Sequence, residues 1–323
     1  MRKRVCVILT LIMFAMNHLL PINAVYAAES VKDEMQSSDI EVVQSLESGR
    51  IYVENGEGDM SAGEGTDSNP YENIRTALNN IQPGQTLVLV GDVAYTKYDV
   101  EADGSAAPLF INKDITIMGA TPDTTFKIRT AIQLGADVTF KDMHLEMIPE
   151  VILGGTGAGT SLGTIVERSA TIYAAGYTLI LDGVSTELGT GSDQNSVPYI
   201  SGGAYKGKTG TRGSHAVIKV INPTAQTKLS AIYAGDYWQD ITMDVDIELD
   251  APLVDKTIHT AGVDGHTLNG DVNVVLGKSN NVAGFDHTDQ TGELNVTITS
   301  DLVTSQLECS QVNHLILEKA SRV

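Results

Sequence analysis

Short apolar runs, bounded by turn residues, recur along the chain. They lie at 115–118, 138–140, 179–181, 217–221, 241–245, 272–276, 294–298 and 315–317. Runs of this length are long enough for β-strands and too short for helices. Their starts are 23, 41, 38, 24, 31, 22 and 21 residues apart. The short intervals predict one solenoid coil each, and the two long ones predict a coil with an insertion or with an unrecognised strand.

A second series of apolar and small residues is interleaved with the first. The sequence Ile-Tyr-Ala-Ala-Gly at 172–176 is echoed at 232–235 and 258–262, and more faintly at 200–203 and 282–284. Two strand types per coil, joined by Gly-rich turns, indicate a parallel β-helix whose coils stack on one another. A β-sandwich also has many short strands, but its strands are joined by hairpin turns of about two to five residues. The longer connections here favour an all-β solenoid.

Residues 69–92 predict a short amphipathic helix, a tight turn and a buried strand. Ser68 and Asn69 are good N-cap residues, and Pro70 suits the first helical position. One apolar stripe follows at Ile74, Ala77, Leu78 and Ile81. Pro83 and Gly84 end the helix, and an apolar strand follows. Alone, this stretch is also an ordinary αβ unit, but with the downstream repeats it is interpreted as an N-terminal cap over the first coil.

The order of features at the start of the repeats resembles a known family. A strand at 51–53 precedes a Gly-rich loop, an Asn-Pro-Tyr helix start at 69–71 and the turn Pro83-Gly84-Gln85. This order is similar to the N-terminal part of the pectate-lyase-like superfamily of right-handed, single-stranded parallel β-helices, although Gln85 replaces the usual acidic residue. Residues 110–119 resemble the next coil. The resemblance is closest to bacterial surface or adhesin-type members and carries no catalytic motif.

The sequence predicts three segments, of which the first two lie within the first 50 residues. Residues 1–27 have a basic start, an apolar run and small residues before Ala27, which is typical of a signal peptide. The alternative, a membrane anchor, needs about 20 apolar residues, and the run here has 16. Residues 28–50 are an acidic, flexible leader, and 51–323 are the β-helix. The repeats run to the end of the chain, so the β-helix is interpreted as truncated there or covered by a partner.

Charge and cysteine content limit the possible partners. The chain has a net charge of −20, and removal of 1–27 leaves 18 Lys and Arg against 41 Asp and Glu, a net −23. That excess argues against binding to nucleic acid or insertion into a membrane after cleavage. Only Cys309 then remains, so no internal disulfide can form. These features predict a protein that is secreted or associated with the surface of a Gram-positive cell.

The most suggestive chemistry lies in residues 240–250, where polar residues, all acidic except Thr242, alternate with apolar ones. In a strand, alternate side chains share a face at a spacing of about 6.6 Å. Carboxylates on one face are candidate ligands for Ca²⁺ as a cofactor. The simpler alternative is a solvated face that prevents aggregation through strand edges. The candidate ligands are Asp244, Asp246, Glu248 and Asp250.

Other candidate groups give weaker signals. Aromatic residues near the Gly-rich repeats could stack on sugar rings or pack as internal ladders; the candidates for ligand binding are Tyr233, Tyr237 and Trp238. The candidates for a lyase site, which show no defined spacing, are Arg129, Lys141, Asp142, Glu146 and Arg168. A hydrolase would need paired carboxylates on adjacent coils. Three histidines lack the spacing of a metal motif and are interpreted as loop residues: His259, His266 and His287.

The expected function is a non-catalytic, exported β-helix region of a bacterial surface or adhesin-like protein. Its expected partner is an extracellular carbohydrate or a surface protein. The alternative is a polysaccharide lyase or glycoside hydrolase acting on an acidic polysaccharide. A passive spacer in the cell wall is the third hypothesis. No catalytic motif in the sequence decides between an enzyme and a binding protein.

Overall fold

A computed structural model describes residues 49–96, 107–147, 170–186, 197–207, 213–299 and 307–318. The predicted signal peptide and nearly all of the leader lie outside these residues, as does Arg168. Gly49–Val323 forms one compact unit. No helix in the described part of the chain is long and apolar enough to cross a membrane.

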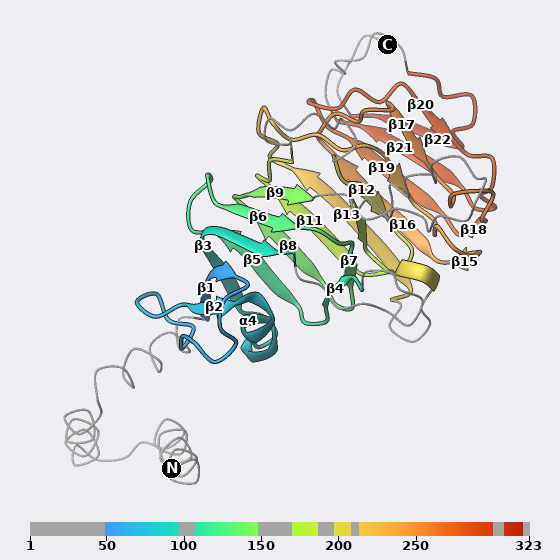
Figure 1. Cartoon of the computed structure of the whole chain (residues 1–323). Helices are drawn as coiled ribbons and strands as arrows, with labels where there is room; N and C mark the ends of the chain where they lie inside the picture. Colours follow the sequence, from blue (N-terminus) through green and yellow to red (C-terminus); the bar gives the residue numbers. More distant parts are fainter. Residues whose placement is uncertain are drawn as a thin grey trace, which may run out of the picture. The chain divides into compact units, whose positions relative to one another are not determined.

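Parallel β-strands make up most of this unit, in two long sheets and one short one (Figure 1). The longer sheet follows the order β2 (Tyr71–Asn73), β1 (Arg50–Gly56), β3 (Thr86–Tyr95), β5 (Ile115–Gly119), β8 (Val138–Lys141), β11 (Thr178–Asp182), β13 (His215–Ile221), β16 (Asp244–Leu249), β19 (Val272–Leu276), β21 (Leu294–Ile298) and β22 (His314–Leu317). Beside this path, β6 (Thr125–Ile128) pairs with β3 and with β9 (His144–Met147).

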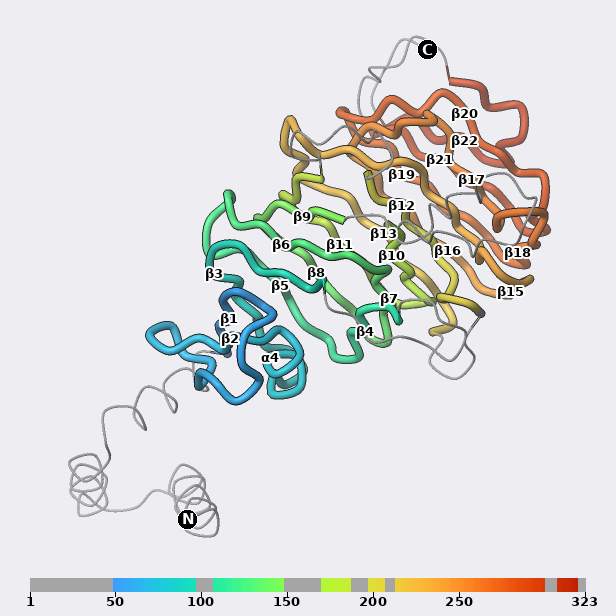
Figure 2. Tube along the Cα trace, viewed as in Figure 1, coloured from blue at the N-terminus to red at the C-terminus, as the bar shows by residue number. Residues whose placement is uncertain are grey.

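The second sheet has seven strands. Its order is β20 (Gly284–Asp286), β17 (Thr257–His259), β14 (Ile232–Tyr233), β12 (Tyr199–Ser201), β10 (Thr171–Tyr173), β7 (Ile132–Leu134) and β4 (Leu109–Ile111). The pair β15 (Ile241–Thr242) and β18 (Leu268–Asn269) forms the short sheet, and a 3-10 turn, η3, spans Tyr205–Gly207. From β4 to β21 the chain enters the longer sheet between successive strands of the shorter sheet, so both sheets run in the same order through the colours of Figure 2.

These two sheets confirm the two interleaved series of strands. The eight runs of the first series fall in the longer sheet, and the second series falls in the shorter sheet. The exception is residues 241–242, which form β15 just before the longer-sheet strand β16. The two long intervals are insertions rather than missed coils, because β11 pairs directly with both β8 and β13. The fold is therefore all-β and built of stacked parallel strands, as a β-helix or solenoid requires.

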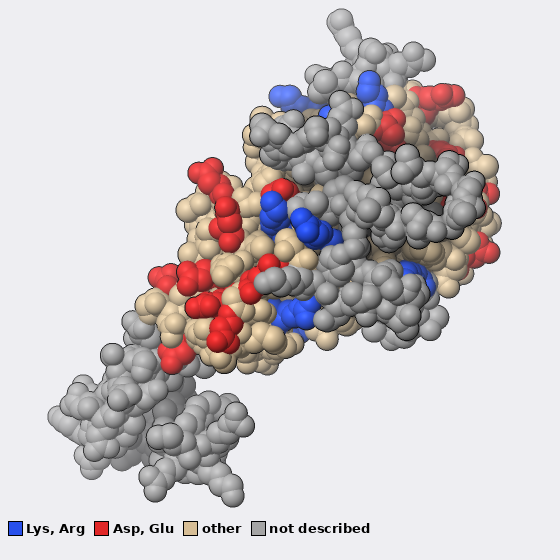
Figure 3. Space-filling model, viewed as in Figure 1, with Lys and Arg blue, Asp and Glu red and all other residues tan. Residues whose placement is uncertain are grey.

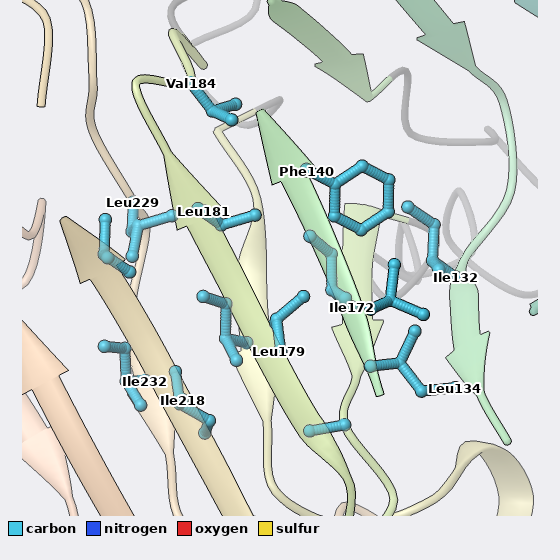
Figure 4. Close-up of a cluster of buried hydrophobic side chains, with 14 of the residues drawn as sticks. Ile132, Leu134, Phe140, Ile172, Leu179, Leu181, Val184, Ile218, Leu229 and Ile232 are labelled. Carbon is cyan, nitrogen blue, oxygen red and sulfur yellow. The ribbon is translucent and has the colours of Figure 1, made fainter. Parts of the chain in front are cut away.

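The core lies between the two long sheets. Because side chains alternate along a strand, every second residue points inward. In the shorter sheet, isoleucines in register form a row that is fully buried: Ile132, Ile172, Ile200, Ile232 and Ile258. Inward residues of the longer sheet, such as Phe140, Leu179 and Ile218, pack in the same cluster (Figure 4). The row of isoleucines fixes which residues of the shorter sheet point outward.

The N-terminal helix begins later than predicted. Residues 71–73 are β2, which pairs with β1, and the helix α4 spans Ile74–Asn80. Its N-cap is Asn73, whose side chain accepts a hydrogen bond from the Arg75 amide (3.0 Å), so the predicted start at Ser68 to Pro70 is wrong. The apolar stripe is correct, since Ile74, Ala77 and Ile81 are buried and Leu78 packs against them.

A lysine from the following coil caps this helix. The Lys113 ammonium donates hydrogen bonds to the carbonyl oxygens of Leu78, Asn79 and Ile81, at 2.9, 3.0 and 2.7 Å. These are carbonyls that the end of a helix leaves without partners, and a positive charge is favourable there. The cap ties α4 to the segment between β4 and β5.

Small residues in the Gly-rich turns allow neighbouring coils to touch. A Cβ atom added to Gly203 would lie 2.5 Å from the Cα atom of Asp236, and one added to Gly235 would lie 2.3 Å from the amide nitrogen of Gly262. These separations are shorter than any side chain tolerates. The repeated glycines are therefore required where the backbone of one turn rests on that of the next.

Candidate functional site

One row of outward side chains crosses the whole shorter sheet. Strand register aligns residues from all seven strands in this row: Phe110, Gln133, Tyr173, Ser201, Tyr233, His259 and Asp286. Every neighbour in this row is one strand away, at a spacing of about 4.8 Å. We call these seven residues the outer row. It brings an aromatic ring, an imidazole and a carboxylate together at its β20 end.

The middle of the outer row is covered by an aromatic cluster. The Tyr173 ring packs edge-to-face against Tyr205 and Tyr237, with centroids 5.6 and 6.0 Å apart, and Trp238 packs on Tyr205. Tyr173, Tyr205 and Tyr237 are buried. The internal packing that the sequence left open is thus confirmed for Tyr237. Tyr233 and Trp238 remain partly exposed at the side of this cluster.

A buried carboxylate holds the turns that carry these aromatic residues. Asp236 is fully buried and accepts hydrogen bonds from the backbone amides of Ala204 (3.2 Å) and Trp238 (2.7 Å). The buried side chain of Gln133 accepts a further one from the Tyr205 amide (2.6 Å). Satisfied buried polar groups of this kind fix a single arrangement. The aromatic cluster is therefore a rigid support beside Tyr233.

The exposed part of the outer row is an Asp–His–Asp arrangement stacked on a tyrosine. The imidazole of His259 lies parallel to the Tyr233 ring, with centroids 4.4 Å apart. Its Nε2 atom is 3.1 Å from Asp255 Oδ2, and its Nδ1 atom is 3.2 Å from Asp286 Oδ2. The side chains of His259, Asp255 and Asp286 are 23%, 36% and 50% exposed. We call Tyr233, Asp255, His259 and Asp286 the His259 site.

The charges of the His259 site support one another. Burial disfavours the charged imidazole, but hydrogen bonds to Asp255 and Asp286 outweigh it, so the pKa of His259 is raised. The Thr288 hydroxyl, with a smaller contribution from His259, lowers the pKa of Asp286. Burial and the nearby carboxylates raise the pKa of Tyr233 to about 12. At neutral pH the site therefore presents a neutral phenol and an ionised Asp286 carboxylate.

The His259 site is not arranged as a metal centre. Asp255 and Asp286 contact opposite nitrogens of one ring, so their oxygens do not converge on a common point as metal ligands must. Across the described ranges of the chain, no group of three or more His, Cys, Asp or Glu side chains could hold a metal ion.

The acidic strand predicted to bind Ca²⁺ is engaged by its neighbours. The alternation is confirmed for β16, because Val245, Ile247 and Leu249 are buried and the carboxylates point outward. Partners from adjacent coils contact all four candidates: Asp244 with the Asp271 amide (3.0 Å), Asp246 with His215 (3.0 Å), Glu248 with Lys219 (2.8 Å) and Asp250 with the Ser279 amide (2.6 Å). These contacts favour the solvated face, and Ca²⁺ binding stays a prediction.

The remaining sequence candidates are spread over the longer sheet and the loops. Lys141 pairs with Asp182 (3.0 Å) and Glu146 with Lys127 (3.3 Å), so these two lyase candidates have structural partners. His287 contacts the side chains of Thr260 and Gln290. These residues stay candidates without a defined constellation.

Sequence reasoning missed Asp255 and the pairing of His259 with two carboxylates. The signal for half of the site was present, because Tyr233 and His259 follow the isoleucine at the same place in two echoes of the repeat. It also missed a pair on β9, where His144 Nδ1 lies 2.9 Å from the hydroxyl of Ser185, and burial lowers the pKa of His144.

Comparison of the chain with protein-family models, with curated proteins and with solved structures found no match.

On the face shown in Figure 3, acidic side chains gather over the β1 and β2 end, while basic ones are fewer. This distribution agrees with the net charge of −20.

Proposed function

We propose that this chain is an exported, non-catalytic β-helix region of a bacterial surface or adhesin-like protein, and that it binds extracellular carbohydrate at the His259 site. The proposal includes a right-handed, single-stranded coil of the pectate-lyase-like type, with α4 covering the first coil. The observation that carries the binding function is the partly exposed stack of Tyr233 on His259, flanked by Asp255 and Asp286.

The side chains of the His259 site are of the types that bind sugars. Aromatic rings offer a flat apolar surface for the C–H face of a sugar, and a tyrosine supplies it with little loss of side-chain freedom. Ionised carboxylates accept strong hydrogen bonds from hydroxyl groups. Because the chain is strongly acidic, it repels polyuronates. The preferred ligand is therefore a neutral glycan.

Binding is tested with the single tryptophan as reporter. Trp238 is the only tryptophan of the chain and packs in the cluster that contains Tyr233. The full chain is titrated with xylohexaose, cellohexaose, chitohexaose and polygalacturonate, with fluorescence and calorimetry as readouts. A neutral glycan is expected to bind, and Tyr233→Ala is expected to weaken it about tenfold, equal to about 1.4 kcal/mol. Tyr52→Ala, on the longer sheet, is the matched control and should bind like wild type.

The proposal is wrong if no neutral glycan produces heat or a fluorescence change. It is also wrong if Tyr233→Ala and Tyr52→Ala bind equally well, because the site would then lie elsewhere.

A second candidate function is glycoside hydrolysis, and one observation favours it. Asp255 and Asp286 contact opposite nitrogens of the His259 ring, so two partly exposed carboxylates flank one side chain, and a hydrolase needs such a pair. They also come from successive coils. Incubation with the same glycans, followed by reducing-end assay and by the absorbance of unsaturated products, tests for hydrolysis and lyase activity. Turnover that Asp286→Asn abolishes would replace the non-catalytic proposal.

A further inference from the structure

Both nitrogens of the His259 ring are engaged by carboxylates. Asp255 Oδ2 and Asp286 Oδ2 can only accept hydrogen bonds when ionised, so each contact needs an N–H from the ring. A charged imidazolium has two N–H groups, whereas a neutral imidazole has one. Only the charged ring therefore satisfies both contacts.

Loss of the proton would leave a lone pair facing a carboxylate. Asp255 lies four residues before His259, and its Oδ1 atom accepts the Thr257 amide (3.0 Å). Asp286 lies on β20, the edge strand of the shorter sheet, and is more exposed, at 50% against 36%. Its other oxygen is held by the Thr288 hydroxyl (2.7 Å). Asp286 is therefore the carboxylate that is better placed to accept a hydrogen bond from outside the site.

Among the described residues, the groups that contact the His259 ring are two carboxylates and a tyrosine, and none of them is basic. Asp255 approaches from the preceding loop, Asp286 from β20 and Tyr233 from β14. Asp264, in the loop after β17, and Tyr199 on β12 act on the Tyr233 hydroxyl, and His287 is hydrogen-bonded to Thr260 and Gln290. The two carboxylates that touch the ring are therefore the charged groups that oppose the effect of burial on the pKa of His259.

We propose that His259 is a pH-dependent gate for the carbohydrate site: the charged ring occupies both carboxylates, and the neutral ring frees Asp286 to accept a ligand hydroxyl. This inference rests on the proposed function and names its regulation. Affinity for a neutral glycan then rises as the pH increases through the pKa of His259. That midpoint lies above the ordinary value of about 6.5.

The gate is tested without ligand by NMR titration of the histidine rings and of the Asp286 carboxylate carbon in the full chain. The His259 midpoint is expected above about 6.5, and Asp255→Asn and Asp286→Asn are each expected to lower it. The Asp286 signal should change at the same midpoint. His144 on β9, whose pKa is lowered by burial and which lies away from the His259 site, should keep its midpoint in both variants and serves as the control. An unchanged His259 midpoint in both variants, or an Asp286 signal that ignores it, overturns the gate.

Ligand binding separates the gate from the proposed function. Glutamine at 259 has one amide donor group and carries no charge, so His259→Gln mimics the neutral ring. With xylohexaose as probe, the affinity of wild type is expected to rise at least threefold from pH 5.5 to 8.5, and that of His259→Gln to stay constant. Equal pH dependence in both proteins overturns the gate and leaves the proposed function intact. If none of the panel glycans binds at any pH, both are overturned.

Discussion

Replacement of Leu179 by alanine tests which residues of β11 face the core. Leu179 is fully buried between the long sheets, in register with Val138 on one side and Ile218 on the other (Figure 4). The next residue, Ile180, points outward between Thr139 and Lys219 and is partly exposed. The two side chains have the same number of carbon atoms and differ in the face they occupy.

The two substitutions should differ in cost several-fold. Truncation of a buried leucine costs about 2–5 kcal/mol, and the cost is high where neighbours cannot move into the cavity. Val138 and Ile218 are held in place by parallel strand pairing, so Leu179→Ala should cost about 4 kcal/mol. Ile180→Ala loses mainly strand propensity and should cost under about 1 kcal/mol. For a domain of this size, about 4 kcal/mol corresponds to a fall in Tm of roughly 8–15 °C.

The assay is thermal unfolding followed by circular dichroism, with urea unfolding as the second measurement. The Tm of Leu179→Ala should fall well below that of Ile180→Ala, and the urea midpoint should follow the same order. Equal losses in the two variants, or a larger loss in Ile180→Ala, would show that the inward and outward faces of β11 are assigned wrongly.

Two further predictions concern the α4 cap and the half-buried His144. Lys113→Met removes three charge-assisted hydrogen bonds to carbonyls at the end of α4 and should lower the free energy of unfolding by about 1.5–3 kcal/mol. The measurement is the calorimetric Tm, and the control is Lys278→Met at an exposed position, which should leave the Tm unchanged. No difference between the two lysine variants would contradict the cap. His144 has a pKa lowered by burial, so its unfolded form binds the proton first, and wild-type stability falls as the pH drops below about 6.5. In His144→Gln the change in Tm between pH 7.5 and 5 should be smaller, and an unchanged slope would exclude His144 as its source.

The alternation of strands was predictable because its determinants are local. Apolar residues with a period of two reveal strands, and the echo of 172–176 at 232–235 and 258–262 marks the second sheet without knowledge of any contact. The start of α4 was not predictable in the same way. Tyr71–Asn73 is drawn into β2 by pairing with β1, about 18 residues earlier in the chain at Val53↔Tyr71, and this contact overrides the local preference of Pro70 for a helix start.

The His259 site shows why a search by spacing failed. Metal and catalytic motifs are recognised along one element, where residues three or four apart share a face. Here Tyr233, His259 and Asp286 are 26 and 27 residues apart, yet they lie side by side, because strand register aligns them. In stacked coils, chemistry is therefore encoded by equivalent positions in successive repeats. The outer face of the longer sheet follows the same rule, since Asp246, Asn273 and Asn295 are in register and joined by hydrogen bonds of 2.8 and 2.9 Å. Tyr233 and His259 can be found from the sequence if the repeats are aligned on their buried isoleucines and the next residue in each is inspected. Asp255 lies outside the repeats, so only the structure places it.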